Sequence, residues 1–171
     1  MKRVLLACAV LIAFATGCPE QPPTVDYSKC PTAASGQVQV AVVVENAPNA
    51  AHKVVCVAVA DGANGIDVLN ARQARLGTAP LRFKNGFLCA IDDVPTAPTC
   101  GTDPAGPDGY TYWSYWQGGT SWSEYQVGAS DSEVHQGSVE GWNYGTWNFV
   151  NTFPTAPTHS SSFSALTGSS A

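Results

Sequence analysis

Positive charge is missing from the second half of this 171-residue sequence. From Asn85 to Ala171 there is no lysine or arginine, although this stretch carries eight acidic residues. A chain without a cationic face cannot neutralise phosphates, which argues against nucleic acid as a partner. The common catalytic motifs are missing too, since there is no G-x-S-x-G, no phosphate-binding loop and no H-E-x-x-H.

Charged residues are scarce overall, at 12% of the chain, whereas 44% of the residues are hydrophobic and 10% are aromatic. This composition is that of a globular protein and not of a disordered one. The length leaves room for one domain after a targeting segment, and it excludes a large multidomain enzyme.

Acidic clusters do not indicate catalysis or a metal site here. Asp92 and Asp93 are the only adjacent acids, and they precede Val94-Pro95 at a strand end, where aspartate is common in turns. Residues 61–67 have some likeness to a calcium loop, but the ligand spacing and the final residue are wrong, and helix capping explains them better. No C-x-x-C is present, and the histidines are scattered: His52, His135 and His159. We therefore expect that the protein holds no metal or resident cofactor and is not an enzyme.

The first eighteen residues have the organisation of an export signal. A basic start is followed by twelve apolar residues from Val4 to Ala15, a run too short for the ~20 residues that span a bilayer. Ala15-Thr16-Gly17-Cys18 resembles the bacterial lipobox, although leucine is commoner than alanine at its first position. We predict that residues 1–17 are removed and that Cys18 carries lipid, which would anchor the protein to the extracytoplasmic side of the cell membrane. Ordinary secretion with cleavage near Gly17 is the alternative.

Four cysteines remain in the mature chain after Cys18, an even number in an oxidising compartment: Cys30, Cys56, Cys89 and Cys100. They allow three pairings. We favour Cys89–Cys100, which would close a short loop containing two prolines, and Cys30–Cys56 then follows by exclusion. Each bridge would stabilise the fold by roughly 3 kcal/mol.

The domain organisation follows from composition. Residues 18–36, which are rich in Pro, Thr, Ser and Ala, are typical of a tether to the membrane. Residues 152–171 are rich in Ser, Thr and Pro, and we expect them to form a flexible tail. The folded domain is predicted between them, over residues 37–151.

Hydrophobic alternation predicts a sheet built largely from hairpins. Residues 37–45 place four valines on one side of a strand, and residues 53–59 form a second strand that pairs with it. Asn85-Gly86 between apolar runs is a strong hairpin signal. Further strands are expected over residues 110–117, 122–127 and 139–144.

One helix is predicted, opening at Asn64 and ending at Gly77. Asn64 can cap the helix, Asp67 suits its positive end, and Ile66, Leu69 and Leu76 lie near one face. The fold class is therefore α+β: a single small disulfide-bonded domain with a mainly antiparallel β-sheet and one covering helix.

Aromatic residues are concentrated in one region. All five tryptophans lie between residues 113 and 147, with five of the six tyrosines in nearly the same stretch. In the strand over residues 110–117 alternation sends large rings to both faces, more than a small core can bury. About half of the rings are explained as core and cross-strand pairs, and the others predict an exposed recognition surface.

An ordered series of motifs resembles a known family. The motifs are Gly86-Phe87-Leu88-Cys89-Ala90-Ile91-Asp92, Cys100, Tyr112-Trp113-Ser114-Tyr115-Trp116, Trp122 and Gly137-Ser138-Val139-Glu140-Gly141-Trp142. The series is similar to actinobacterial secreted proteins found beside cobalt or cobalamin transport genes, which in turn resemble the C-terminal domain of transcobalamin and intrinsic factor. The resemblance covers residues 38–145. Relatives usually have a cysteine near the chain end as partner for the one matching Cys56, whereas this chain has Cys30.

The resemblance implies a ligand-binding accessory for uptake of a corrinoid such as cobalamin, with vitamin or cobalt transporter components as partners. Aromatic walls suit the broad, partly apolar corrin ring. The candidate contacts are aromatic: Tyr112, Trp113, Trp116, Trp122 and Trp142. His135 could approach the cobalt, although a solvated loop histidine is the commoner explanation.

A cell-envelope or glycan-binding module is the alternative function. Exposed tryptophan and tyrosine rings stack on sugar faces, and carboxylates or amides then bind the hydroxyls. The side chains that could do so are Glu124, Asn143, Glu140 and Gln117. The residues alone do not separate this function from corrinoid binding.

Overall fold

A five-stranded sheet forms the centre of the computed structural model, which describes residues 24–46, 52–97, 109–148, 150 and 152–170. The strands are β1 (Gln37–Glu45), β2 (Val54–Ala60), β5 (Tyr110–Gln117), β6 (Ser123–Glu124) and β7 (Val139–Trp147), in the order β2-β1-β7-β5-β6. The predicted signal segment, Cys18 and Cys100 lie outside the described residues. Within the described ranges, no helix has both the length and the apolarity to cross a bilayer.

Antiparallel pairs dominate the sheet, so the predicted α+β class with a mainly antiparallel sheet is confirmed. β1 pairs with β2, and β5 pairs with both β6 and β7, in antiparallel register. The exception is β1 with β7, a parallel pair in which Ala41 lies opposite Val139. Distant parts of the chain therefore meet at the middle of the sheet.

Helix α1 (Gly65–Leu76) begins and ends where the sequence predicts. The Asn64 side chain accepts from the backbone of Asp67, the Asp67 side chain accepts from the backbone of Asn64, and Gly77 ends the helix in the left-handed conformation. The buried face differs from the prediction: Val68 and Leu69 are buried, while Ile66 and Leu76 are half-buried.

Arg72 of α1 is also buried, because its guanidinium lies 2.8 Å from the Asp92 carboxylate and donates to the His52 carbonyl at 3.0 Å. Charge pairing and hydrogen bonding offset the cost of burying an arginine. This ion pair fixes the turn after the small hairpin of β3 (Arg82–Lys84) and β4 (Phe87–Ala90) against the helix.

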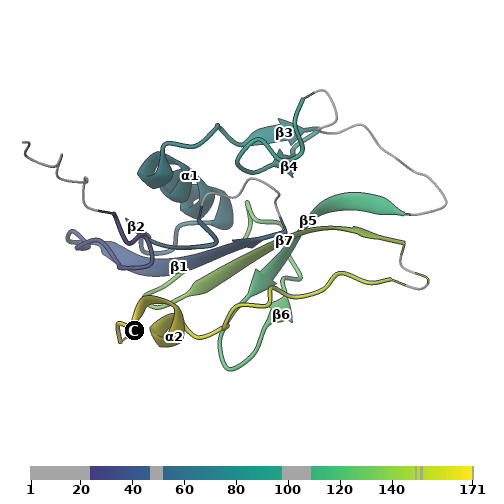
Figure 1. The fold of residues 1–171 in the computed structure, drawn as a ribbon. Helices are drawn as coiled ribbons and strands as arrows, with labels where there is room; N and C mark the ends of the chain where they lie inside the picture. The colour runs from purple at the N-terminus through teal and green to yellow at the C-terminus, as the bar shows by residue number, and fades with distance from the viewer. Residues whose placement is uncertain (1–23, 47–51, 98–108, 149, 151, 171) are drawn as a thin grey trace, which may run out of the picture.

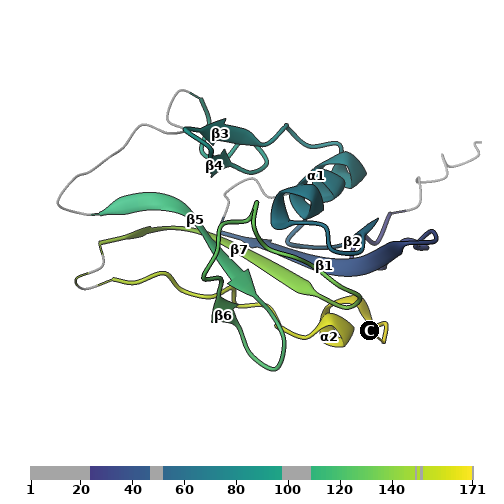
Figure 2. The ribbon, with the colours of Figure 1, turned by 180° about the vertical axis from the view of Figure 1, so that it is seen from behind.

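The sheet is covered on both faces (Figures 1 and 2). On one face, here called the helix face, α1 and the β3–β4 hairpin cover a core that includes Val40, Val42, Val55, Val57 and Trp142. On the other, here called the tail face, the C-terminal segment with α2 (Phe163–Thr167) covers Ala41, Val43, Cys56 and Val139. Alternation along β1 sends its neighbouring side chains to the two cores.

Residues 152–170 are therefore not the flexible tail that composition predicts. Phe163 is buried in the tail-face core, and the Glu45 carboxylate accepts from the backbone N–H groups of Thr158 and His159, both at 2.8 Å. The Asn143 amide donates to the Thr155 carbonyl at 2.7 Å. The sequence of this segment resembles a linker, but its polar backbone finds partners on two central strands.

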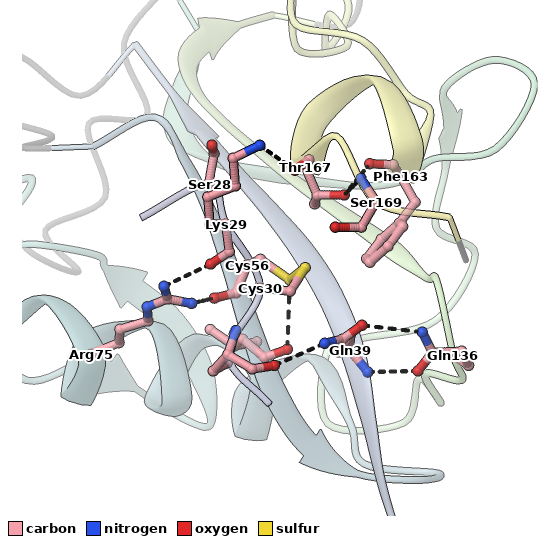
Figure 3. The surroundings of a disulfide bond; sticks show 12 residues. Ser28, Lys29, Cys30, Gln39, Cys56, Arg75, Gln136, Phe163, Thr167 and Ser169 are labelled. Atoms are coloured by element: carbon pink, nitrogen blue, oxygen red, sulfur yellow. Dashed lines mark hydrogen bonds between the residues drawn. A yellow bond between two sulfur atoms is a disulfide. The ribbon is translucent and has the colours of Figure 1, made fainter. Parts of the chain in front are cut away.

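Part of the predicted tether, residues 24–36, is likewise fixed to the domain (Figure 3). The Cys30–Cys56 disulfide is present, which confirms that pairing. Arg75 donates to the Lys29 carbonyl at 2.7 Å, and the Lys29 ammonium donates to the Thr167 carbonyl at 3.3 Å. Cys89 is also disulfide-bonded, but Cys100, its expected partner, lies outside the described residues.

Candidate functional site

A cavity of about 1190 Å³ opens on the helix face, between the β3–β4 hairpin and the beginning of β5. The first turn of α1 reaches it through Ile66, and β7 contributes Trp142 and Tyr144. Residues 127–131, here called the wall loop, form another part of the lining. Ligand sites usually occupy roughly 300–1,000 Å³, so this cavity is large for a small domain.

The hairpin side of the cavity carries exposed aromatic rings. Phe83 and Phe87 flank the Asn85-Gly86 turn, and Phe87 is 78% exposed. Asn85 and Gly86 both have positive φ, as a tight hairpin turn requires. Tyr110 on β5 and Val127 of the wall loop are exposed as well, so part of the rim of the cavity is apolar.

The deeper part of the cavity is formed by packed rings from β5 and β7, and Tyr125, after β6, stacks on one of them. The Trp113 and Tyr144 rings lie 5.0 Å apart, and the Tyr115 ring lies 4.3 Å from Trp142 and 4.1 Å from Tyr125, nearly parallel to both. The Trp113 indole N–H donates to the Val94 carbonyl at 2.9 Å. These contacts give the apolar floor a fixed shape.

Three of the five aromatic residues predicted to bind ligand line the cavity: Tyr112, Trp113 and Trp142. Trp116 and Trp122 do not. The Trp116 indole donates to Ser114 at 2.9 Å, and the Trp122 indole donates to the His159 carbonyl at 2.9 Å in the C-terminal segment. A ligand-binding role for any of the five remains a prediction.

Sequence reasoning missed the hairpin phenylalanines and the wall loop. Phe83 and Phe87 belong to the apolar runs around Asn85-Gly86, from which we predict only a hairpin, although two apolar rings beside an Asn-Gly turn are a signal of an exposed apolar tip. The wall loop has no strong pattern, and its position depends on tertiary contacts.

His135, proposed as a cobalt contact, is exposed and lies 2.8 Å from the Asp61 carboxylate. It is not among the residues that line the cavity. Within the described residues, no group of three or more His, Cys, Asp or Glu side chains is placed to hold a metal ion.

Two of the four polar residues considered for glycan binding are engaged inside the protein. Glu140 and Asn143 are buried, and both hydrogen-bond to protein partners. Glu124 and Gln117 are exposed. The arrangement therefore leaves fewer groups for sugar hydroxyls than the sequence suggests.

Glu140 lies behind the stacked rings and is 0% exposed. Its carboxylate accepts from the Tyr115 hydroxyl and, at 2.7 Å, from the Tyr125 hydroxyl. Burial raises the pKa of Glu140 from 4.5 to about 7, against the lowering effect of the two tyrosine hydroxyls. Burial and the nearby Glu140 carboxylate likewise raise the pKa values of Tyr115 and Tyr125, so both remain neutral donors.

Comparison with known proteins adds two likenesses. A model of the SCO2322-like domain matches residues 105–171. A crystal structure of haptocorrin in complex with Cbi is similar at a TM-score of 0.48 and 18% identity, over 64% of this chain and 25% of the haptocorrin chain. The present chain thus spans about a quarter of that protein's length. No curated protein matches the sequence. The C-terminal part of the chain, which carries β5, β7 and α2, is therefore similar to SCO2322-like domains.

Proposed function

We propose that this domain binds a large, flat and partly apolar ligand of the corrinoid class in the cavity on the helix face. The observation that carries the proposal is the cavity itself, about 1190 Å³ with aromatic rings on its floor and rim. Such a shape suits a broad ring better than a small metabolite. The motif series that resembles cobalamin-associated proteins supports the corrinoid class.

Polar groups at the rim can orient such a ligand. Asn85, Ser130 and Asp131 line the cavity and are exposed. A corrin carries amide groups around its edge, and amide, hydroxyl and carboxylate side chains are suitable hydrogen-bonding partners for them. Apolar contacts would thus supply affinity and the rim would supply orientation.

We further propose that a lipid on Cys18 holds the domain at the extracytoplasmic side of the membrane, as an accessory to uptake. Cys30, which the disulfide fixes to the sheet, lies only 12 positions after Cys18. A fully extended segment of this length spans at most about 40 Å, so the cavity would stay close to the membrane. Mass spectrometry of the N-terminus tests this, and an unmodified Cys18 in the mature chain would contradict it.

The binding proposal is tested by titration of the mature chain, with Cys18→Ser to prevent lipidation, with cyanocobalamin. We expect saturable heat in calorimetry and saturable quenching of tryptophan emission after correction for the vitamin's absorbance, because Trp113 and Trp142 line the cavity. Absence of both signals at tens of micromolar ligand would contradict the proposal. Retention on insoluble peptidoglycan without corrinoid binding would favour the glycan-binding alternative.

A further inference from the structure

A continuous row of oxygen atoms links buried Glu140 to the wall of the cavity. The Tyr115 hydroxyl lies between the Glu140 carboxylate and the Ser132 hydroxyl, 2.8 Å from the latter. The Ser132 hydroxyl donates to the Ala129 carbonyl at 3.1 Å and accepts from the Gly65 N–H at 2.9 Å. Ala129 belongs to the wall loop.

Proton counting distinguishes the two forms of Glu140. The row has three oxygen–oxygen gaps, Glu140 to Tyr115, Tyr115 to Ser132 and Ser132 to Ala129, and each gap needs one hydrogen. With Glu140 ionised, the two hydroxyls supply two hydrogens, so one gap has none. With Glu140 neutral, three hydrogens fill three gaps, donated in sequence from Glu140 to the Ala129 carbonyl.

The neutral arrangement also satisfies each hydroxyl fully. Ser132 then accepts from Gly65 and Tyr115 and donates to Ala129, which is the whole capacity of a hydroxyl group. In the ionised form, the Tyr115 hydroxyl donates its hydrogen bond to the Glu140 carboxylate. Ser132 must then leave either Tyr115 or the Ala129 carbonyl without a donor.

We propose that Glu140 is a positioning residue of the cavity: its neutral carboxyl completes the hydrogen-bonded row that holds the wall loop at Ala129, and its ionisation leaves one link of the row without a hydrogen and so weakens that hold. The effect on ligand affinity rests on the proposed function, but the effect on the wall loop does not.

The surroundings of Glu140 support this role. The titratable groups that act on it are the hydroxyls of Tyr115 from β5 and Tyr125 after β6. Among the described residues, no Lys, Arg or His makes an ion pair with it. The neighbouring strand β1 places Val42 beside it in register, and the acids of the adjacent loop and helix cap are exposed: Asp131, Glu133 and Asp67. Burial raises the pKa of Glu140 to about 7, so both forms exist near neutral pH.

Amide hydrogen exchange of the mature chain, with Cys18→Ser, tests the proposal without any ligand. Between pH 5.5 and pH 8.5, protection factors over residues 127–132 should fall by about tenfold, the equivalent of one lost hydrogen bond. The midpoint should lie near 7, whereas protection in β1 should stay constant. Glu140→Gln should keep the low-pH protection throughout, because the glutamine amide donates to Tyr115 permanently.

Three further measurements make the test decisive. Ser132→Ala removes the last link and should lower loop protection at pH 5.5, which keeps the test valid if Glu140→Gln fails to fold. His135→Gln removes the exposed pair with Asp61 and should leave the transition intact. Cyanocobalamin should bind the wild type more weakly at pH 8 than at pH 6, and Glu140→Gln equally at both.

The proposal would be overturned if the protection factors of the wild type did not change between pH 5.5 and pH 8.5. It would also be overturned if the transition persisted in Glu140→Gln and disappeared in His135→Gln. If cyanocobalamin bound at neither pH 6 nor pH 8, only the proposed function would be refuted. The exchange data would still decide the role of Glu140.

Discussion

Two buried glutamates on opposite faces of one sheet differ in their chemistry. Glu45 on β1 is 2% exposed on the tail face, and Glu140 on β7 is 0% exposed on the helix face. Glu45 accepts from two backbone N–H groups, the Thr158 hydroxyl and the His159 ring. Among the described residues, the donors to Glu140 are two tyrosine hydroxyls.

The donors explain the opposite pKa shifts. Burial alone would raise the pKa of Glu45, but the hydrogen bonds from Thr158 and His159 outweigh it and hold the pKa below 4.5. For Glu140 burial dominates and the pKa rises to about 7. A buried carboxylate with enough donors thus stays ionised and keeps its hydrogen bonds at neutral pH, while one with few donors remains able to change its charge there.

The largest expected effect comes from uncovering the tail face. Phe163→Ala should lower the free energy of unfolding by about 4 kcal/mol, because it empties a buried ring site. Urea denaturation measures the change. Ser164→Ala, at the exposed neighbouring position, is the control and should stay near wild type. A loss below 1 kcal/mol in Phe163→Ala would mean that the C-terminal segment does not stabilise the sheet.

Glu140→Gln should abolish a pH dependence of stability on the helix face. Because the pKa of Glu140 is raised, the folded protein holds its proton more tightly, and stability falls as the pH rises from 4.5 through 7. The free energy of unfolding of the variant, relative to that of the wild type, should therefore rise by about 3 kcal/mol between pH 4 and pH 8. Denaturation at several pH values measures the difference, and a constant difference would contradict the raised pKa.

Glu45→Gln should act in the opposite direction. The lowered pKa of Glu45 stabilises the fold above its ordinary value of 4.5, and this contribution is lost as the pH falls below it. At pH 7 the variant should lose about 2 kcal/mol because the donors from Thr158 and His159 lose a charged acceptor. This difference in the free energy of unfolding should become smaller as the pH falls below 4.5. Glu133→Gln, at an exposed carboxylate, is the control.

The smallest effect on stability is expected at the cavity rim. Phe87→Ala should change the free energy of unfolding by no more than about 0.5 kcal/mol, since the ring is exposed. Cyanocobalamin affinity should fall about tenfold if the ring covers the ligand. Phe153→Ala removes another exposed ring, outside the cavity lining, and should not affect affinity. Equal affinities for both variants would exclude the hairpin from the site.

Local signals predicted the elements that depend on local chemistry. The cap at Asn64, the Asn85-Gly86 turn and the strand over residues 110–117 all match the structure, since each is determined by neighbouring residues. The packing of the C-terminal segment could not be predicted, because its composition resembles a linker. Its partners, Glu45 and Asn143, belong to strands β1 and β7 outside the segment.

The candidate site was predictable only in part, for the same reason. Aromatic density identified Trp113 and Trp142, but it could not separate them from Trp116 and Trp122, which the sheet directs to other contacts. The role of Glu140 depends on Tyr115, Tyr125 and Ser132 meeting in space, which no sequence spacing reveals. Likewise, the parallel pairing of β1 and β7 has no local signal.

The central place of β7 has a consequence for synthesis of the protein. β7 separates β1 from β5 in the sheet, yet among the described strands it is the last to leave the ribosome. Until residues 139–147 are available, the β1–β2 pair and β5 each keep an open edge, the kind of edge that promotes aggregation. Stepwise folding of the nascent chain would therefore stop at incomplete sheets, and the sheet cannot close until residue 147 has been released from the ribosome.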